Sequence, residues 1–369
     1  MRKKNIILTV IMLLSIMLSG CGTDTQGDKK TEDPLKAILL IPGELGDKSF
    51  YDSANNGMKL IEEKFGAKTK VVEMSTDFTK WEPNFLDAIE GDWDLIISGG
   101  SATEMMNEIA VQYPDERFIN FDASVEGEVE NVYSILYGAN ELSFLAGVCA
   151  ALVTESDMEL ANEEPIIGFI GGMDIPGIND FLVGYIEGAQ FIDEDIKVIV
   201  SYAGSFTDPA KGKELSLIQY KQAADISFNV AGGTGLGVID AAKEGNKYAI
   251  GVDSDQALLF AETDKEKASH IVTSAIKRID NSILRAVTKY VDGTLEFGTY
   301  ETLGVTEGGV GLAKNEYYND LLSDEMKATI ENVESKLNEG EITVKSALGM
   351  STEEINEMRN SVKPKNENN

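Results

Sequence analysis

The sequence has few cysteines, few histidines and few positive charges, and each shortage excludes a class of function. Two cysteines and one histidine, His270, leave no cluster that could hold zinc, so we predict no metal site and no cofactor. The 63 acidic residues outnumber the 32 basic ones and give a formal net charge of −31. Such a surface repels nucleic acid and gives no sign of a basic groove that would follow a phosphate backbone. We therefore expect no nucleic-acid partner.

Long apolar runs are also rare, and the one near the start of the chain has the features of a signal peptide. Basic residues at 2–4 precede an apolar run at 6–17, which is too short for a transmembrane helix. The residues at 18–21, Leu-Ser-Gly-Cys, resemble a bacterial lipobox, in which cleavage before the cysteine lets its thiol carry a lipid. We expect residues 1–20 to be a lipoprotein signal peptide and Cys21 to be the lipid attachment site, at the extracytoplasmic face of the bacterial cell membrane. The alternative is an ordinary secreted protein in which Cys21 has no role.

Polar segments flank the remainder of the chain. Residues 21–35 carry few apolar side chains and are predicted to be a flexible tether, and residues 361–369 are predicted to be a polar tail. The chain between them is long enough for two domains, each with its own core. The second cysteine, Cys149, lies in an apolar helical run, so it is interpreted as a small buried hydrophobe.

Short apolar runs alternate with helical patterns at intervals of roughly twenty to thirty residues, which indicates parallel βαβ units. The alternation runs through both halves of the chain. We predict an α/β fold made of two Rossmann-like lobes joined by a hinge, with a ligand cleft between them. A late strand at 270–275 is expected to return to the first lobe. The predicted boundaries are therefore 36–138 plus 270–295 for lobe 1 and 139–269 plus 296–360 for lobe 2.

The stretch at 226–255 contains the clearest candidate for a binding site. It is predicted to form a strand, a glycine turn, a helix and a second strand that ends at Asp253. Gly232 and Gly233 belong to the turn, whose backbone N–H groups are open to a ligand. Ligands bind at this carboxyl edge of an open α/β sheet. The glycines and Asp253 fit a loose dinucleotide-binding pattern, and they also fit a turn that only links a strand to a helix.

Other candidate side chains follow strands at the same edge, and each has a structural alternative. Asp47 and Phe50 either face the cleft or belong to the start of the next helix. Asp122 is either a ligand group or an ordinary turn aspartate. Phe206, in a polar loop, is either a core side chain or an exposed ring that can stack on a planar ligand. Lys277 either donates to a ligand hydroxyl or is a solvated surface lysine.

Several blocks of the sequence resemble the basic membrane lipoprotein family, whose members include the purine nucleoside receptors of ABC transporters. No single block decides the resemblance, which depends on the order and spacing of all of them. In chain order the blocks are 47–50, 171–176, 204–212, 231–235, 251–256, 273–278 and 308–311.

The resemblance implies a type I periplasmic-binding fold whose lobes close on a purine nucleoside (inosine, guanosine or adenosine) and deliver it to ABC permease subunits. It also implies roles for the candidate residues. Two aromatic rings would stack on the purine, carboxylates would accept from the base edge, and a carboxylate with a lysine would hold the ribose. These roles fall to Phe50 and Phe206 for the rings, Asp122 and Asp47 for the base, Asp253 with Gly232 and Gly233 for the ribose, and Lys277 reaching the sugar from the other lobe.

One position departs from the family pattern. Many members carry asparagine where this chain has Tyr51, which leaves the preferred base open. The resemblance implies a binding protein and not an enzyme. Separately, the sequence shows no activated nucleophile and no metal-ligand cluster, which an enzyme would need. A sensor lipoprotein that uses the same cleft without transport, and a secreted nucleoside-processing enzyme, are the alternatives. A dinucleotide does not suit this compartment, where soluble redox cofactors are scarce.

Overall fold

The computed structural model describes residues 33–123 and 129–364, and the structural statements below concern these residues. The chain from Leu35 onward forms one compact unit. The predicted signal peptide at 1–20 and the predicted lipid attachment site Cys21 lie outside the described residues. Most of the predicted tether and the end of the predicted tail also lie outside them.

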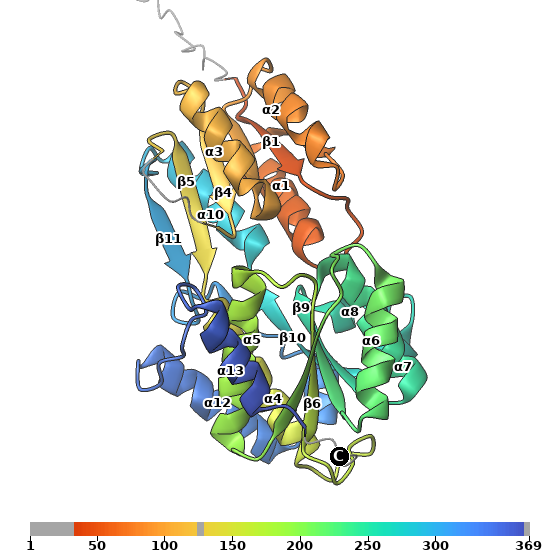
Figure 1. Ribbon diagram of the computed structural model, residues 1–369. Coiled ribbons are helices and arrows are strands. Elements are labelled where there is room, and N and C mark those ends of the chain that lie inside the picture. The colour runs from red at the N-terminus through yellow and green to blue at the C-terminus, as the bar shows by residue number, and fades with distance from the viewer. Residues whose placement is uncertain (1–32, 124–128, 365–369) are drawn as a thin grey trace, which may run out of the picture. The chain divides into compact units, whose positions relative to one another are not determined.

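The first lobe is built on a six-stranded parallel sheet in the order β11-β5-β4-β3-β1-β2 (Figure 1). Side chains alternate along β1, so Leu39 packs against α1 and α10 on one face while Leu40 packs against α2 and α3 on the other. The elements of this lobe are β1 (Lys36–Ile41), α1 (Phe50–Phe65), β2 (Lys68–Glu73), α2 (Trp81–Ile89), β3 (Leu95–Gly99), α3 (Thr103–Gln112), β4 (Phe118–Phe121), β5 (Val132–Tyr137), α10 (Ile279–Val291) and β11 (Tyr300–Leu303).

The second lobe has a six-stranded sheet in the order β12-β10-β9-β8-β6-β7, in which only β12 runs antiparallel to its neighbour. Helix α4 is buried almost all round and carries Cys149, whose thiol has its pKa raised to about 12 by burial. The elements are α4 (Ala139–Thr154), β6 (Ile166–Gly171), α5 (Pro176–Ile192), β7 (Lys197–Tyr202), α6 (Pro209–Lys221), β8 (Ile226–Val230), α7 (Gly235–Gly245), β9 (Tyr248–Asp253), α8 (Gln256–Ala261), α9 (Lys265–Ala268), β10 (Ile271–Lys277), β12 (Val310–Leu312), α11 (Glu316–Leu321), α12 (Asp324–Asn338) and α13 (Thr352–Ser361).

The two sheets repeat one topology. Strands β2-β1-β3-β4-β5-β11 of the first correspond in order to β7-β6-β8-β9-β10-β12 of the second. The prediction of an α/β fold with two similar lobes is therefore confirmed. Because all strands except β12 are parallel, six carboxyl ends meet at one edge of the first sheet and five at one edge of the second, and these edges position the candidate site.

The predicted lobe boundaries are wrong for the strands β10 and β11, whereas α10 lies in lobe 1 as predicted. Strand β10 pairs with β9 in the second sheet, so it does not return to the first lobe. The chain crosses only after Lys277, when α10 packs on α1 and β11 pairs with β5. It then returns to the second sheet with β12. The apolar run of β10 specifies a buried strand, but it does not specify which strand will be its neighbour.

The first residues of the predicted polar tail at 361–369 are ordered, because Ser361 ends helix α13 and Val362 is buried. Helix α13 begins with a capping box, in which the Ser351 hydroxyl accepts from the Glu354 N–H and the Glu354 carboxylate accepts from the Ser351 N–H. Val362 follows it, is fully buried, and accepts a hydrogen bond from the backbone N–H of Val198 at 2.8 Å. Across the described residues, no helix is long and apolar enough to cross a membrane.

Candidate ligand-binding site

Two aspartates stand at equivalent carboxyl ends of the two sheets. Asp122 directly follows β4, and Asp253 is the last residue of β9, the strand at the same position in the second sheet. Both have a left-handed backbone, with φ of 70° and 62°. Few residues other than glycine adopt this conformation, and aspartate is among those that tolerate it best. The repeated topology thus presents a carboxylate from each lobe.

The glycine turns after the preceding strands are equivalent too. Gly100 follows β3 and Gly232 follows β8, with φ of 58° and 54°, and each begins a short 3₁₀ turn. A side chain at Gly233 would lie 3.2 Å from the carbonyl oxygen of Phe206 and 3.8 Å from the β-carbon of Asp47. The structure therefore brings the predicted residues Gly232, Gly233, Phe206 and Asp47 into one region.

Asp47 organises the loop before α1. Its carboxylate accepts hydrogen bonds from the backbone N–H groups of Ser49, Tyr51 and Asp52, at 3.0, 2.9 and 3.1 Å. Burial raises the pKa of this carboxyl, while the three hydrogen bonds act in the opposite direction. Of the two alternatives for Asp47, the structure favours the start of the helix, because the acceptor oxygens are already occupied by backbone donors.

The same loop reaches the second lobe. The Ser49 hydroxyl is fully buried and donates to the Asp253 carboxylate at 2.5 Å. The side chain of Gln256 donates to the carbonyl of Lys48 at 3.1 Å, and the Ser254 hydroxyl donates to the carbonyl of Ser49 at 3.3 Å. Sequence reasoning did not select Ser49, although it lies inside the block at 47–50 that carries the family resemblance.

Asp253 is a buried carboxylate with a perturbed acidity. Asp253 is only 6% exposed, and burial raises the pKa of its carboxyl group to about 6. Nearby Asp122 and Asp47 raise the pKa further, whereas Lys277 and the hydrogen bond from Ser49 lower it. A carboxylate in this setting gains from any ligand that brings hydrogen-bond donors, since burial without enough partners is unfavourable.

Lys277 is not a solvated lysine. It is 4% exposed, and its Nζ lies 2.5 Å from Oδ1 of Asp122 in the other lobe. The ammonium also lies 5.0 to 5.6 Å from the centroids of the Phe181, Tyr137 and Phe50 rings. Its contacts with these rings and with Asp122 place the Lys277 ammonium group at the junction of the two lobes.

The origin of Lys277 differs from the prediction. It is the last residue of β10, which pairs with β9, and Ile276 is in register with Asp253. Lys277 and Asp253 therefore come from the same lobe, and Lys277 does not approach from the other side. The error has the same cause as the misplaced lobe boundary, because the partner of β10 was assigned wrongly.

The two candidate aromatic rings belong to different lobes, and both are half-buried. The Phe50 ring lies 5.4 Å from the ring of Phe121 and faces Gly100, where an added side chain would lie 3.3 Å from it. The Phe206 ring lies against Gly172, so closely that a side chain there would clash with it. Each ring is supported by a glycine on one side.

Tyr51, which departs from the family pattern, is turned toward its own loop. Its hydroxyl donates to the carbonyl of Pro42 at 3.2 Å, and its ring covers Gly43. Burial raises the pKa of this phenol, and the nearby carboxylates Asp47 and Asp122 raise it further. The hydroxyl is thus committed to the backbone, while the ring adds bulk close to both carboxylates.

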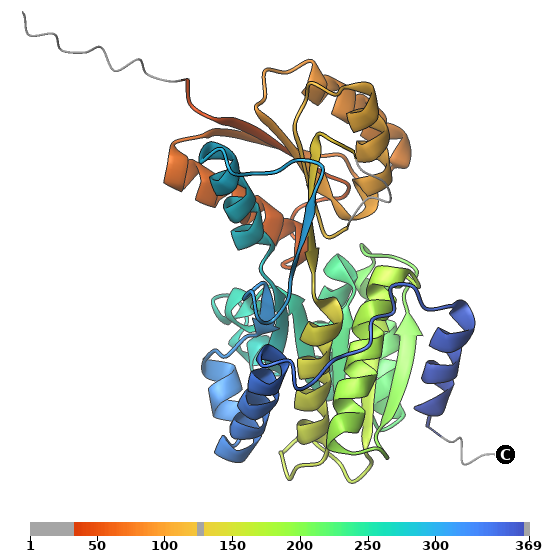
Figure 2. The same ribbon diagram turned by 90° about the vertical axis from the view of Figure 1, so that its left-hand side faces the viewer.

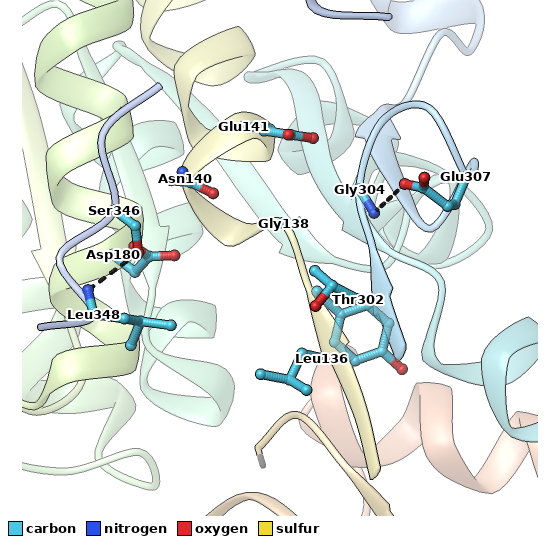
Figure 3. Close-up of a pocket in the computed structure, with 11 residues that line it drawn as sticks. Leu136, Gly138, Asn140, Glu141, Asp180, Thr302, Gly304, Glu307, Ser346 and Leu348 are labelled. Carbon is cyan, nitrogen blue, oxygen red and sulfur yellow. Dashed lines mark hydrogen bonds between the residues drawn. The ribbon is translucent and has the colours of Figure 1, made fainter. Parts of the chain in front are cut away.

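A cavity of about 340 Å³ lies where the chain crosses between the lobes (Figure 3). None of the predicted site residues lines it, but Tyr137 does, and the same ring contacts Lys277. Its carboxylates hold backbone of the crossing segments: Glu141 accepts from the N–H of Val305, and Glu307 accepts from that of Gly304, each at 2.9 Å. The cavity is therefore part of the hinge and adjoins the site. Its lining consists of Leu136, Tyr137, Gly138, Asn140, Glu141, Asp180, Thr302, Gly304, Glu307, Ser346 and Leu348.

Two lobes of one topology, with carboxylates and rings at their facing edges and a hinge crossed by three segments, define a two-lobed substrate-binding protein with a type I periplasmic-binding fold. A crystal structure of an ABC transporter solute-binding protein from Aeropyrum pernix K1 has the same fold, with a TM-score of 0.77 and 25% identity, over 88% of this chain and 98% of that one. Residues 35–347 match the Bmp family, described as "ABC transporter substrate-binding protein PnrA-like". The chain belongs to this family.

Characterised relatives agree with the family assignment. The chain is 30% identical to the "ABC transporter nucleoside-binding protein BmpA" of Lactococcus lactis, over 94% of this chain and 100% of that protein. It is 31% identical to the "Basic membrane protein A" of Borreliella burgdorferi, over 93% of this chain and 96% of that protein. The resemblance stated from the sequence blocks is thereby confirmed.

Proposed function

We propose that this protein is the lipid-anchored, extracytoplasmic receptor of an ABC importer, and that it binds a purine nucleoside between its lobes. One observation carries the proposal: Asp253 and Lys277 of the second lobe face Ser49 and Asp122 of the first, with both polar pairs buried or half-buried. The name of the Lactococcus lactis relative supports a nucleoside as the ligand.

The chemistry of a nucleoside suits these groups. It is neutral, with a flat ring system, a polar edge and vicinal hydroxyls. Phe50 and Phe206 offer one ring from each lobe for stacking. Asp253 accepts from the ribose hydroxyls, while Asp122 accepts from donors on the base edge. Lys277 pairs with Asp122 and lowers the pKa of Asp253, which reduces the cost of burying two negative charges.

Lobe movement about the hinge accounts for binding without a reaction. The three crossing segments are short, and the loop that carries Ser49 already contacts the second lobe. A ligand held by both lobes favours the closed arrangement, because it adds contacts that exist only there. The closed form is then the one that a permease receives. The family to which the chain belongs is described as a substrate-binding protein, which favours binding over the enzyme alternative.

The ligand class can be tested by thermal unfolding. A ligand that binds only the native state at a hundredfold excess over its dissociation constant stabilises the protein by about 2.7 kcal/mol. We expect inosine, guanosine or adenosine to raise the melting temperature by several degrees, and amino acids and simple sugars to leave it unchanged. A shift caused only by a sugar or an amino acid would contradict the proposal.

The anchor is a separate part of the proposal and rests on the lipobox at 18–21. We expect Cys21→Ala to release the protein from bacterial membranes while leaving its melting temperature unchanged. If the variant stayed with the membrane fraction after a salt wash, Cys21 would not be the anchor.

A further inference from the structure

The last helix of the described chain lies beyond the residues that match the family, yet it contacts the second lobe beside the candidate site. The match ends at residue 347, and α13 spans 352–361. Figure 2 shows the dark blue chain running across the second lobe to reach α13 at its side. Arg359 on this helix has a side chain that is only 18% exposed. The partners of this side chain connect α13 to the loops beside the candidate site.

The Arg359 guanidinium binds three side chains at the carboxyl edge of the second sheet. It contacts both carboxylate oxygens of Asp174, at 2.6 and 3.0 Å. It also donates to the side-chain oxygen of Asn179 at 2.8 Å and to the hydroxyl oxygen of Tyr202 at 2.7 Å, and it lies over the Tyr202 ring. A two-pronged contact to a carboxylate fixes orientation as well as distance, which a lysine could not do.

These partners lie in or beside two loops that meet at Phe206. Asp174 lies in the β6–α5 loop (residues 172–175), and Tyr202 ends β7, directly before the loop that carries Phe206. Gly172, in the first loop, forms the surface on which the Phe206 ring lies. Its carbonyl also accepts a hydrogen bond from the N–H of Ser205 at 3.0 Å. Arg359 therefore holds the support of the ring on one side and the start of its loop on the other.

Helix α13 is also attached by contacts that do not involve Arg359. Ile355 packs in a small apolar cluster with Val183 and Ala347, and Val362 bonds to Val198. Those contacts dock α13 on the second lobe away from the loops. The bonds from Arg359 to Asp174, Asn179 and Tyr202 instead add a connection to the edge of the sheet where the ligand is proposed to bind.

We propose that Arg359 is a positioning residue: through Asp174 and Tyr202 it fixes the height of the Phe206 ring against a planar ligand. The inference rests on the proposed function, since it assigns Arg359 a role at the same site. An arginine without such a role would affect only the stability of α13. If Arg359 has the positioning role, loss of its guanidinium leaves the two loops free to move. Ligand binding must then order these loops, which lowers the affinity.

The test compares two variants on one helix by calorimetric titration with the nucleoside that gives the largest thermal shift. Arg359→Ala should weaken binding by about 3- to 10-fold, in line with the cost of ordering one or two loops. The control Ile355→Ala removes packing from the same helix but leaves the contacts to the loops. It should lower the melting temperature and change the affinity less than about twofold. Equal effects of both variants on affinity would overturn the inference.

A double variant separates positioning from a general loss of structure. If Arg359 acts through the Phe206 ring, Arg359→Ala should cause no further loss of affinity in a Phe206→Ala background, because the two changes remove one interaction. Additive losses would overturn the inference. Asp174→Ala removes the same two-pronged contact from an exposed loop, so it serves the same comparison if Arg359→Ala does not fold.

The two proposals fail in different ways. If Phe206→Ala weakens binding and neither Arg359→Ala nor Asp174→Ala does, the positioning role is wrong while the nucleoside site remains. If the parent protein binds none of the nucleosides, both proposals are wrong.

Discussion

The loops that follow the first strand of each sheet occupy equivalent places, but they are held in different ways. In the first lobe, Asp47 lies within the loop and Asp52 in the first turn of α1, and both accept backbone N–H groups of the loop. In the second lobe, the β6–α5 loop is held by Arg359, a residue 185 positions away from Asp174. The two loops have equivalent places in the repeated fold, but different side chains fix them. The first lobe relies mainly on a local solution, while the second adds a distant one to the local hydrogen bond from Asn179 to Asp174.

The largest effect is expected from the local solution. Asp47→Ala leaves three backbone N–H groups at the start of α1 without their charged acceptor. We expect the free energy of unfolding to fall by roughly 2–4 kcal/mol, measured by urea denaturation. The control Asp77→Ala removes an aspartate that accepts from one backbone N–H at an exposed turn, and should lower the free energy of unfolding much less than Asp47→Ala does. Equal losses would show that the loop does not depend on Asp47.

The second prediction separates the carboxylate from the ring in the second lobe. Asp253→Ala removes charge-assisted hydrogen bonds to the ribose, worth about 1.5–3 kcal/mol each, so nucleoside affinity should fall by about a hundredfold. The free base does not use this carboxylate and should bind as before. Phe206→Ala should instead weaken nucleoside and free base alike, because both stack on the ring. Titrations in which Asp253→Ala weakens both ligands equally would show that our orientation of the ligand is wrong.

The smallest effect concerns pH and the ligand-free protein. Because burial raises the pKa of Asp253 from 3.8 to about 6, the folded state binds this proton more tightly than the unfolded state. Stability attributable to Asp253 is therefore fully present below about pH 4 and is lost as the pH rises to about 6, by roughly 1–3 kcal/mol. Urea denaturation at pH 4, 5, 6 and 7 gives the free energy of unfolding of the parent and of Asp253→Asn. The parent should lose stability relative to the variant as the pH rises. A difference between the two proteins that stays constant with pH would contradict the prediction.

Those features of the fold that depend on local pattern were predictable from the sequence. The alternation of apolar runs and helical periods indicates two α/β lobes, and strand ends place Asp122 and Asp253 at the binding edge. The partner of β10 was not predictable, because an apolar run is compatible with either sheet. The sequence left the burial of Lys277 open for a related reason. A lysine after a strand is usually solvated, and only the assembled rings of Phe50, Tyr137 and Phe181 enclose this one.

The site residues also include some that the sequence could identify and some that it could not. The family blocks named Phe50 and Phe206, which the structure places on different lobes beside glycine turns. They did not reveal that Asp47 is occupied by its own loop, because a carboxylate near a helix start has the same sequence pattern in both roles. Arg359 carries no sequence signal of its role at all. Its partners come from strands and loops that are distant in the chain, and such contacts exist only once the fold has formed.

The hydrogen bond between Ser49 and Asp253 joins the two lobes through one oxygen of the carboxylate. A ligand that needs both carboxylate oxygens has to displace the Ser49 hydroxyl, so its binding exchanges one hydrogen bond for another. If this bond holds the lobes together when no ligand is bound, only the fraction of molecules with separated lobes can capture one, and the apparent affinity is reduced by that fraction. Capture and release are then both slowed, because each requires the lobes to separate.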